Sequence, residues 1–178
     1  IYSKSKVLYG LFFSKNSIVK KDRCLLVEGY TDVVSMHQSG IENVVASSGT
    51  SLTVEQIKLI KRFTNNITLL FDGDAAGIKA ALRGVNLILQ EGMNVKVLTF
   101  PAGEDPDSYA KKVSSEDFEN YITKQSKDFI EFKCSLLLEE AKEDPIKRAE
   151  LIKDVAATIA LIPDNVSRTV YAQSSSSI

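Results

Sequence analysis

The sequence predicts an α/β fold: a parallel sheet flanked by helices, followed by an all-helical subdomain. Two observations lead to this prediction. Short apolar runs alternate with segments of helical periodicity up to about residue 100, the order expected of a parallel sheet with right-handed crossovers. From about residue 115 onward, no strand-type run recurs, and the apolar residues follow helical spacing instead.

The elements of the sheet can be assigned in chain order. Strand-type apolar runs occupy residues 23–29, 42–48, 65–72 and 94–100. Helices are expected between them, over residues 31–39, from residue 53 onward and over residues 74–90. Thr53 and Gln56 have the spacing of a capping box, and Gly40 and Gly92 are typical helix ends.

The last third of the chain is expected to be helical. Two sets of apolar residues repeat at helical spacing: Phe129, Phe132 and Leu136, and then Ile152, Val155, Ala156 and Ile159. Pro145 and Pro163 separate these helices, because proline cannot continue a helix in its interior. We therefore expect a helical appendage beside or beyond the sheet.

The composition is that of a soluble globular domain, with 44% hydrophobic and 25% charged residues. No apolar run approaches the roughly 20 residues of a membrane helix. Cys24 and Cys134 are expected to be buried, reduced thiols, and the single histidine, His37, a helix-surface residue. The chain starts without methionine, and we expect it to be a piece of a longer protein.

Charge is unevenly distributed along the chain. The net charge is −1, but residues 1–23 hold six basic residues against one acid, a local charge of +5 that leaves −6 for the rest. A basic segment beside an acidic body can hold phosphates on one side and metal on the other. A solvated surface of uneven charge explains the same distribution equally well.

Acidic residues follow the expected ends of three strands. Glu28 ends the first strand, and Asp72 and Asp74 follow the third. The other acids in comparable places are Asp32, one helical turn beyond Glu28, and Glu104, Asp105 and Asp107 after the fourth strand. Carboxyl ends of parallel strands meet at one edge, where ligands of such sheets bind. Crowded carboxylates favour hard divalent cations such as Mg²⁺, and a pair of these ions suits chemistry at phosphates.

Each motif by itself has a simpler explanation. An Asp-Gly-Asp sequence is most often a turn and a helix cap, and the acids before Pro106 fit a solvated loop that starts a helix. Their joint placement favours the metal site. In the loop of residues 47–53, capping explains Thr53, whereas Gly49 and Thr50 are left open as phosphate contacts at a helix start. This loop lacks the Gly-Lys-Ser/Thr ending of a P-loop.

Four motifs together resemble the TOPRIM domain of bacterial DnaG-type primases: VEGYTDVV (27–34), ASSGTSLT (46–53), LLFDGDAAG (69–77) and GEDPD (103–107). The lead-in YSKSKVLYGL (2–11) resembles the segment before TOPRIM, and the tail with SRTVYAQ resembles the helical subdomain that closes the primase core. The resemblance implies a Rossmann-like TOPRIM domain over residues 23–113. It also implies the end of a preceding basic subdomain over 1–22 and a helical subdomain over 114–178.

The resemblance also implies residue roles. Glu28, Asp72 and Asp74 would be the catalytic centre and the central metal ligands. Further ligands, direct or through water, would be Asp32, Asp105 and Asp107. The cofactor would be Mg²⁺ or Mn²⁺, as two or more ions. Lys4 and, as a weaker candidate, Lys6 would contact the phosphates of the incoming nucleotide.

The implied activity is DNA-templated synthesis of short RNA primers during DNA replication, by metal-dependent nucleotidyl transfer. The implied partners are single-stranded DNA template, ribonucleoside triphosphates and a replicative helicase that binds a domain outside this chain, with no membrane. The implied location is the bacterial cytoplasm. Two alternatives stay open: another TOPRIM enzyme, either a metal-dependent nuclease or a topoisomerase-like protein, and a non-catalytic nucleotide-binding module. Tyr30 is interpreted as a packing residue rather than a topoisomerase nucleophile.

Overall fold

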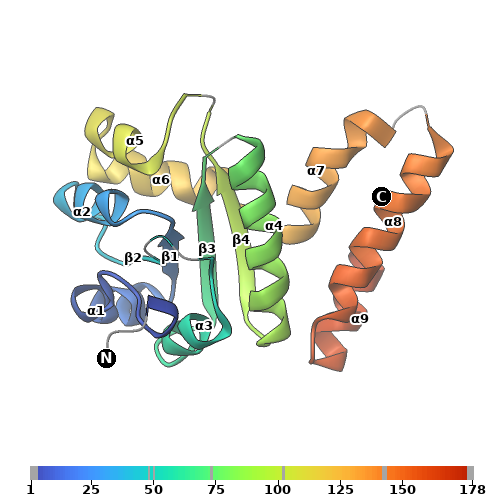
Figure 1. The fold of residues 1–178 in the computed structure, drawn as a ribbon, viewed down its shortest axis with the longest axis horizontal. Helices are drawn as coiled ribbons and strands as arrows, with labels where there is room; N and C mark the ends of the chain where they lie inside the picture. Colours follow the sequence, from blue (N-terminus) through green and yellow to red (C-terminus); the bar gives the residue numbers. More distant parts are fainter. Residues whose placement is uncertain are drawn as a thin grey trace.

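The computed structural model of the chain describes residues 4–47, 49, 51–72, 74–101, 103–141 and 144–175, without the side chains of 137–141. Within these residues, five strands form one sheet in the order β2-β1-β3-β4-β5 (Figure 1). The strands are β1 (Cys24–Val27), β2 (Val44–Ala46), β3 (Asn66–Phe71), β4 (Asn94–Thr99) and β5 (Lys127–Asp128). The helices are the 3₁₀ helix η1 (Lys4–Lys6), α1 (Leu11–Lys21), α2 (Tyr30–Gln38), α3 (Val54–Lys61), α4 (Ala75–Gln90), α5 (Pro106–Lys112), α6 (Ser115–Gln125), α7 (Phe129–Ala141), α8 (Pro145–Ala160) and α9 (Asn165–Ser175).

Strands β1 to β4 are parallel, as the alternation of elements predicts. β1 lies between β2 and β3, and β3 pairs with β4 over its whole length. Their carboxyl ends therefore lie along one edge. The fifth strand is a difference from the prediction: β5 runs antiparallel to β4, with Lys96 opposite Asp128. Two residues are too few to form a recognisable apolar run, so the sequence gives no sign of this strand.

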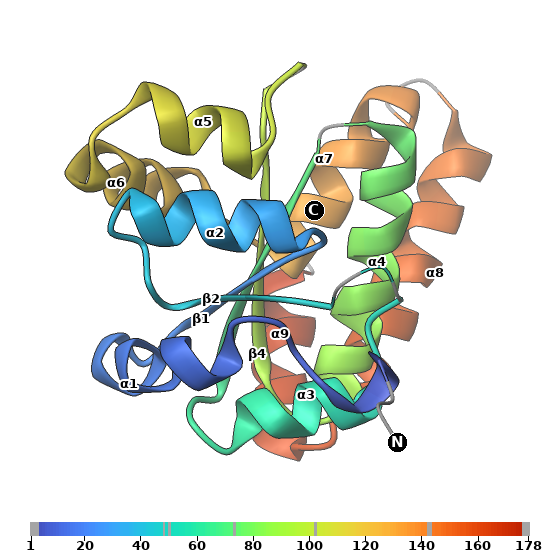
Figure 2. The same ribbon diagram turned by 60° about the vertical axis from the view of Figure 1, so that its left-hand side comes forward.

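Helices cover both faces of the sheet, which is why the central strands are apolar almost throughout. Figure 2 shows α2, α5 and α6 on one side of the strands and α4, α7 and α8 on the other. In β3, Leu69 and Phe71 pack towards the α4 side, and Leu70 packs towards the α2 side. The core is thus two apolar layers, separated by the sheet.

The N-terminal part is anchored to the sheet. The predicted capping box is confirmed, because Thr53 Oγ1 accepts the Gln56 N–H at 3.2 Å and Gln56 Oε1 accepts the Thr53 N–H at 3.1 Å. Helix α1, which the sequence patterns do not predict, packs on the sheet edge, where Ser14 Oγ donates to the Val44 carbonyl at 2.6 Å. The same hydroxyl lies 3.1 Å from Nε2 of His37, so this histidine is half-buried rather than at the surface.

The C-terminal helices extend outward on the α4 side of the sheet (Figure 1). Phe129 and Phe132 of α7 are buried, as are Val155 and Ile159 of α8, which agrees with the predicted apolar faces. Ile152 departs from the prediction, because 56% of its surface is exposed.

Helix α6 packs in the apolar layer on the α2 side through Phe118 and Ile122. The predicted boundary near residue 113, between the domain that contains the sheet and the helical subdomain, stays a prediction.

The two cysteines are buried, free thiols, as the sequence predicts, and burial raises the pKa of both Cys24 and Cys134. Within the described part of the chain, every helix is too short or too polar to span a bilayer.

Candidate active site

Three acids meet at the carboxyl edge of the two central strands. β1 and β3 are adjacent and in register, with Leu26 opposite Leu69, so the residues that follow them emerge at the same edge. Glu28 follows β1, and Asp72 and Asp74 follow β3. All three line one cavity of about 490 Å³, between the sheet edge, the loop before α3 and helix α4.

Several of these acids also cap helices, which confirms the simpler explanation of the motifs, whereas the metal site stays a prediction. Asp74 Oδ1 accepts the Gly77 N–H at 2.7 Å and starts α4. Asp32 Oδ2 accepts the Gly29 N–H at 3.1 Å, and Asp105 Oδ1 accepts an N–H of α5 at 2.6 Å. Among the described residues, each carboxylate uses one oxygen in this way, which leaves the other oxygen able to bind a cation.

The turn after β3 requires a glycine in the helix that follows it. A Cβ on Gly77 would lie 2.5 Å from the carbonyl oxygen of Asp72, closer than any real Cβ contact. The absence of a side chain therefore lets the first turn of α4 lie directly against the end of β3. This contact fixes Asp72 relative to Asp74.

The carboxylates perturb one another electrostatically. Loss of hydration raises the pKa of Glu28, and the charges of Asp72 and Asp74 raise it further. The pKa of Asp72 is raised by desolvation, then by Asp105 and Asp74. Such mutual repulsion is relieved by protons or by cations.

Among these acids, Asp32 has the largest rise in pKa. Desolvation raises its pKa to about 6, against the lowering effect of its hydrogen bond from Gly29 N–H. The charges of Asp105, Asp72 and Asp107 add to the rise. Asp32 therefore belongs with the acids that follow the strands. Together they form an acidic rim, which consists of Glu28, Asp32, Asp72, Asp74, Asp105 and Asp107.

Asp107 differs from the other acids of the rim because it is already paired. It accepts a hydrogen bond from Lys111 at 2.6 Å and another from Ser35, and these bonds lower its pKa. Lys112 and Ser108 lower the pKa of Glu104 in the same way. The carboxylates after β4 thus divide into Asp105, whose charge acts on the other acids, and Glu104 and Asp107, which already have hydrogen-bond partners.

The rim suits a divalent cation in its chemistry, although it is not a ready-made cage. Within the described residues, no three His, Cys, Asp or Glu side chains converge closely enough to hold an ion by themselves. Every candidate ligand is a carboxylate oxygen, the donor that Mg²⁺ and Mn²⁺ prefer. Mg²⁺ commonly keeps several waters and needs only one or two carboxylates. The residues present therefore fit this cofactor.

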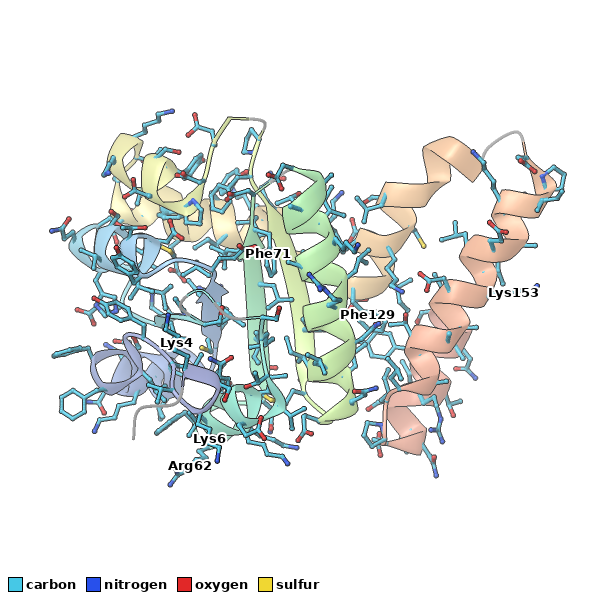
Figure 3. All side chains as sticks on the ribbon, in the orientation of Figure 1. Lys4, Lys6, Arg62, Phe71, Phe129 and Lys153 are labelled. Carbon is cyan, nitrogen blue, oxygen red and sulfur yellow. The ribbon has the colours of Figure 1, made fainter. Side chains whose placement is uncertain are left out.

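The two candidate lysines are held near the loop before α3, not against the carboxylates. Gln56 Nε2 donates to the carbonyl of Lys4 at 3.1 Å and to that of Ser47, which lines the acidic cavity, at 3.4 Å. The side chains of Lys4 and Lys6 are exposed, and neither forms an ion pair with another described residue. Figure 3 shows both lower in the view than Phe71, the last residue of β3.

The cavity contains a basic residue that the sequence motifs do not single out. Arg83 lines it from α4, together with Ala76 and Ala80. These residues stand at i, i+4 and i+7, so the signal was present in the sequence as one face of the predicted helix. Gly49, left open as a phosphate contact, also lines the cavity, whereas Thr50 lies outside the described residues.

Tyr30 is not a buried packing residue, because 59% of its surface is exposed. Its ring contacts that of Tyr9, with 5.9 Å between centroids. The Tyr9 backbone pairs with Ala46 of β2 through hydrogen bonds of 2.9 and 3.1 Å. Tyr30 stands two residues after Glu28, so an exposed aromatic pair lies next to the acidic rim in sequence.

The fold and its acids define a class of protein. Residues 25–110 match the Toprim-like family model, so the chain contains a Toprim-like domain. A DNA primase of Staphylococcus aureus is 37% identical over 166 residues, which are 93% of this chain and 27% of that protein.

Solved structures give the same relationship over nearly the whole chain. A DNA primase domain from Pseudomonas aeruginosa matches with a TM-score of 0.86 and 34% identity, over 97% of this chain and 55% of that one. The DnaG primase catalytic domain bound to ssDNA matches with a TM-score of 0.85 and 33% identity, over 97% and 57%.

The chain thus belongs to the DnaG-type primases and corresponds to part of their catalytic core. It spans about 27% of the length of the S. aureus primase.

Proposed function

We propose that this chain is the nucleotidyl-transfer part of a DNA primase core, which joins ribonucleotides into short primers on single-stranded DNA. One observation supports this most: Glu28, Asp72 and Asp74 leave adjacent parallel strands, share one cavity and are coupled through their charges. The related primases support the reaction, and a related catalytic domain bound to ssDNA supports the kind of template.

The proposed metal ligands are the acids of the rim. Glu28, Asp72 and Asp74 would hold the central ions, with the outer carboxylates Asp32, Asp105 and Asp107 serving further ions directly or through water. We expect Mg²⁺ or Mn²⁺, as two or more ions. When bound, the ions would supply charge stabilisation at the attacking and leaving oxygens. Asp107 is the weakest candidate, because Lys111 and Ser35 already occupy its oxygens.

Side chains of this chain would accept the proton and bind the phosphates. The raised pKa of Glu28 makes its carboxylate a better base for the proton of a 3′ hydroxyl. Arg83 lines the same cavity as the acids, and its guanidinium would bind a phosphate there. Lys4 and Lys6 are exposed and would bind nucleotide or template phosphates, a contribution that salt weakens. Base pairing with the template would select the nucleotide.

The wider setting follows from the same proposal. The substrates would be ribonucleoside triphosphates, and a replicative helicase would bind a part of the protein outside this chain. We propose that residues 23–113 are the TOPRIM domain, flanked by the end of a basic subdomain over 1–22 and a helical subdomain over 114–178. The enzyme would work in the bacterial cytoplasm.

Calorimetry of ATP binding, with and without Mn²⁺, tests the proposal on this chain and on its Asp72→Asn variant. We expect ATP to bind only with Mn²⁺ and the variant to lose that binding while it stays folded. Glu150→Gln, an exposed acid on α8, is the matched control and should bind as the original chain does.

Other outcomes favour the other classes. Mn²⁺ binding without ATP binding, together with metal-dependent cleavage of DNA, would favour a nuclease. ATP binding that ignores Mn²⁺ and survives Asp72→Asn would favour a nucleotide-binding module. Equal binding by Asp72→Asn and Glu150→Gln would contradict the role given to the rim.

A further inference from the structure

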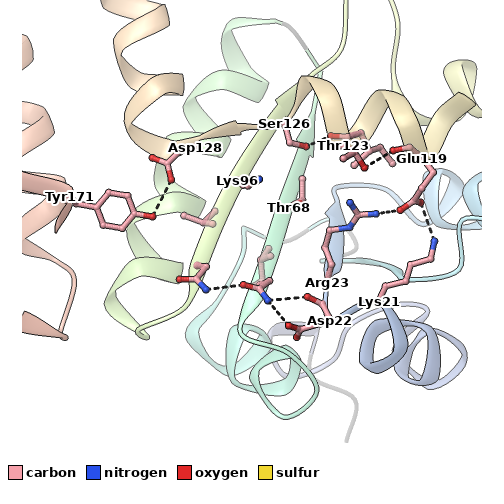
Figure 4. Close-up of a pocket in the computed structure, with 15 residues that line it drawn as sticks. Lys21, Asp22, Arg23, Thr68, Lys96, Glu119, Thr123, Ser126, Asp128 and Tyr171 are labelled. Atoms are coloured by element: carbon pink, nitrogen blue, oxygen red, sulfur yellow. Dashed lines mark hydrogen bonds and ion pairs between the residues drawn. The ribbon is translucent and has the colours of Figure 1, made fainter. Parts of the chain in front are cut away.

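A second cavity lies at the opposite ends of the strands from the acids. It has a volume of about 630 Å³ and is formed where β1, β3 and β4 begin, with α6, β5 and α9 as its other walls (Figure 4). This size is within the range of roughly 300 to 1,000 Å³ typical of small-molecule sites. None of the residues assigned to the acidic rim lines it.

Polar side chains replace apolar ones on the sheet face that floors this cavity. Thr68 of β3 is only 2% exposed and stands directly opposite Lys96 of β4 in the register. Farther along the same face, Leu70 and Leu98 are opposite each other and belong to the apolar core. Thr68 is buried, whereas the side chain of Lys96 is exposed, so this end of the face is polar and lines the cavity with one buried and one exposed donor.

The floor of the cavity carries hydrogen-bond donors without partners. Nε of Arg23, just before β1, is buried and has no hydrogen-bond partner among the described residues. Within the same residues, the Thr68 hydroxyl forms no hydrogen bond. Lys96 forms neither a hydrogen bond nor an ion pair within 4.0 Å with any of them, and its charge acts on Asp128, the residue opposite it in the register of β4 and β5. Because β1, β3 and β4 are neighbours, these three donors come from adjacent strands.

The acids of the cavity, by contrast, already have donors. Glu119 accepts from Lys21 at 3.0 Å and from Arg23, and Asp128 accepts from the Tyr171 hydroxyl at 3.1 Å (Figure 4).

The third acid, Asp22, accepts from the side chains of Thr64 at 2.7 Å and Asn66 at 3.0 Å. The formal charges of the lining cancel, but two of its donors, Arg23 Nε and the Thr68 hydroxyl, have no acceptor among the described residues.

We propose that this cavity binds a small ligand through a carboxylate or phosphate group, with Arg23, Thr68 and Lys96 as its donors. Arg23 Nε and the Thr68 hydroxyl are buried donors without an acceptor, which is unfavourable, and an anionic oxygen removes that penalty. Lys96 is exposed and adds a positive charge for a charge-assisted hydrogen bond. The ring of Tyr171 and the side chain of Ile122 offer apolar surface to the rest of the ligand. The site is independent of the acidic rim and does not depend on the primase assignment.

NMR titration of the 178-residue chain with inorganic phosphate, and separately with acetate, tests the site. We expect saturable shifts of the Arg23 Nε–H signal and of the Thr68 and Lys96 amides, with the amide of Asp72 unmoved. Thr68→Val and Lys96→Met should each weaken the affinity about tenfold, the effect of losing one charge-assisted bond. Thr68→Ser keeps the hydroxyl and should restore binding.

The controls separate a built site from a general ion effect. Lys124→Met removes an exposed charge on α6 outside the cavity and should leave the affinity unchanged. Saturation with phosphate only, or with acetate only, would support the proposal and identify the group. Shifts that never saturate, or that Thr68→Val and Lys96→Met leave unchanged, would mean an adventitious ion only and would overturn it.

Discussion

Asp32→Asn should stabilise the metal-free protein at neutral pH. Desolvation raises the pKa of Asp32 from 3.8 to about 6, and neighbouring acids add to the rise, so folding takes up a proton between these two values. The contribution of this carboxyl to stability is fully present below pH 3.8 and is lost as the pH rises through about 6. Asparagine removes the charge but keeps an oxygen to accept the Gly29 N–H.

The magnitude follows from the pKa shift. A shift of about two units corresponds to about 3 kcal/mol between the two protonation states. The carboxyl is only partly buried, and solvent screening reduces the gain to about 1 to 1.5 kcal/mol. For a chain of this length, that gain raises the melting temperature by about 3 to 5 °C.

Thermal unfolding in EDTA, from below pH 3.8 to well above pH 6, measures the effect. The variant should exceed the original chain in stability only on the high-pH side, and the difference should shrink when Mg²⁺ is added or the salt concentration is raised. A stability difference that is constant across this pH range would refute the reasoning, because a lost or gained packing contact does not titrate.

Three further changes test other parts of the structure. Gly77→Ala should cost about 1 to 3 kcal/mol and weaken Mn²⁺ binding, since the new Cβ would meet the Asp72 carbonyl at 2.5 Å; urea unfolding and calorimetry check it. Gln56→Ala should remove the side-chain donor that ties the carbonyls of Lys4 and Val7 to α3, cost about 1 to 3 kcal/mol and speed amide exchange in the N-terminal segment. Lys133 is 3% exposed and donates to Asp154 at 2.7 Å, so Asp154→Ala should destabilise more than Lys133→Met in urea unfolding.

Each of these changes has a matched comparison. Lys79→Ala, on an exposed position of the same helix as Gly77, should leave both stability and Mn²⁺ binding unchanged. Gln56→Glu keeps the size of the side chain but loses its donor, and should be as harmful as Gln56→Ala. If Lys133→Met proved the more destabilising of that pair, the buried ammonium would be stabilising by itself and the reasoning would be wrong.

Much of the fold could be predicted because the relevant signals are local. Thr53 and Gln56 form the capping box that their spacing indicates, and α5 begins at Pro106 as expected. The strands β1, β2 and β3 can be recognised as apolar runs, because both of their faces are buried and little polar alternation remains. β5 and the exposure of Ile152 could not be predicted in this way, since both depend on which distant surface happens to lie opposite.

The same division applies to the candidate site. The sequence by itself determined which acids follow which strands, and hence that Glu28, Asp72 and Asp74 would reach one edge of a parallel sheet. Only the tertiary structure decided how free each acid is: Asp107 is held by Ser35 from a distant helix, whereas Asp32 is desolvated among other carboxylates. Which residues follow a strand can be predicted from local pattern, but the hydration and partners of a side chain depend on residues far away in sequence.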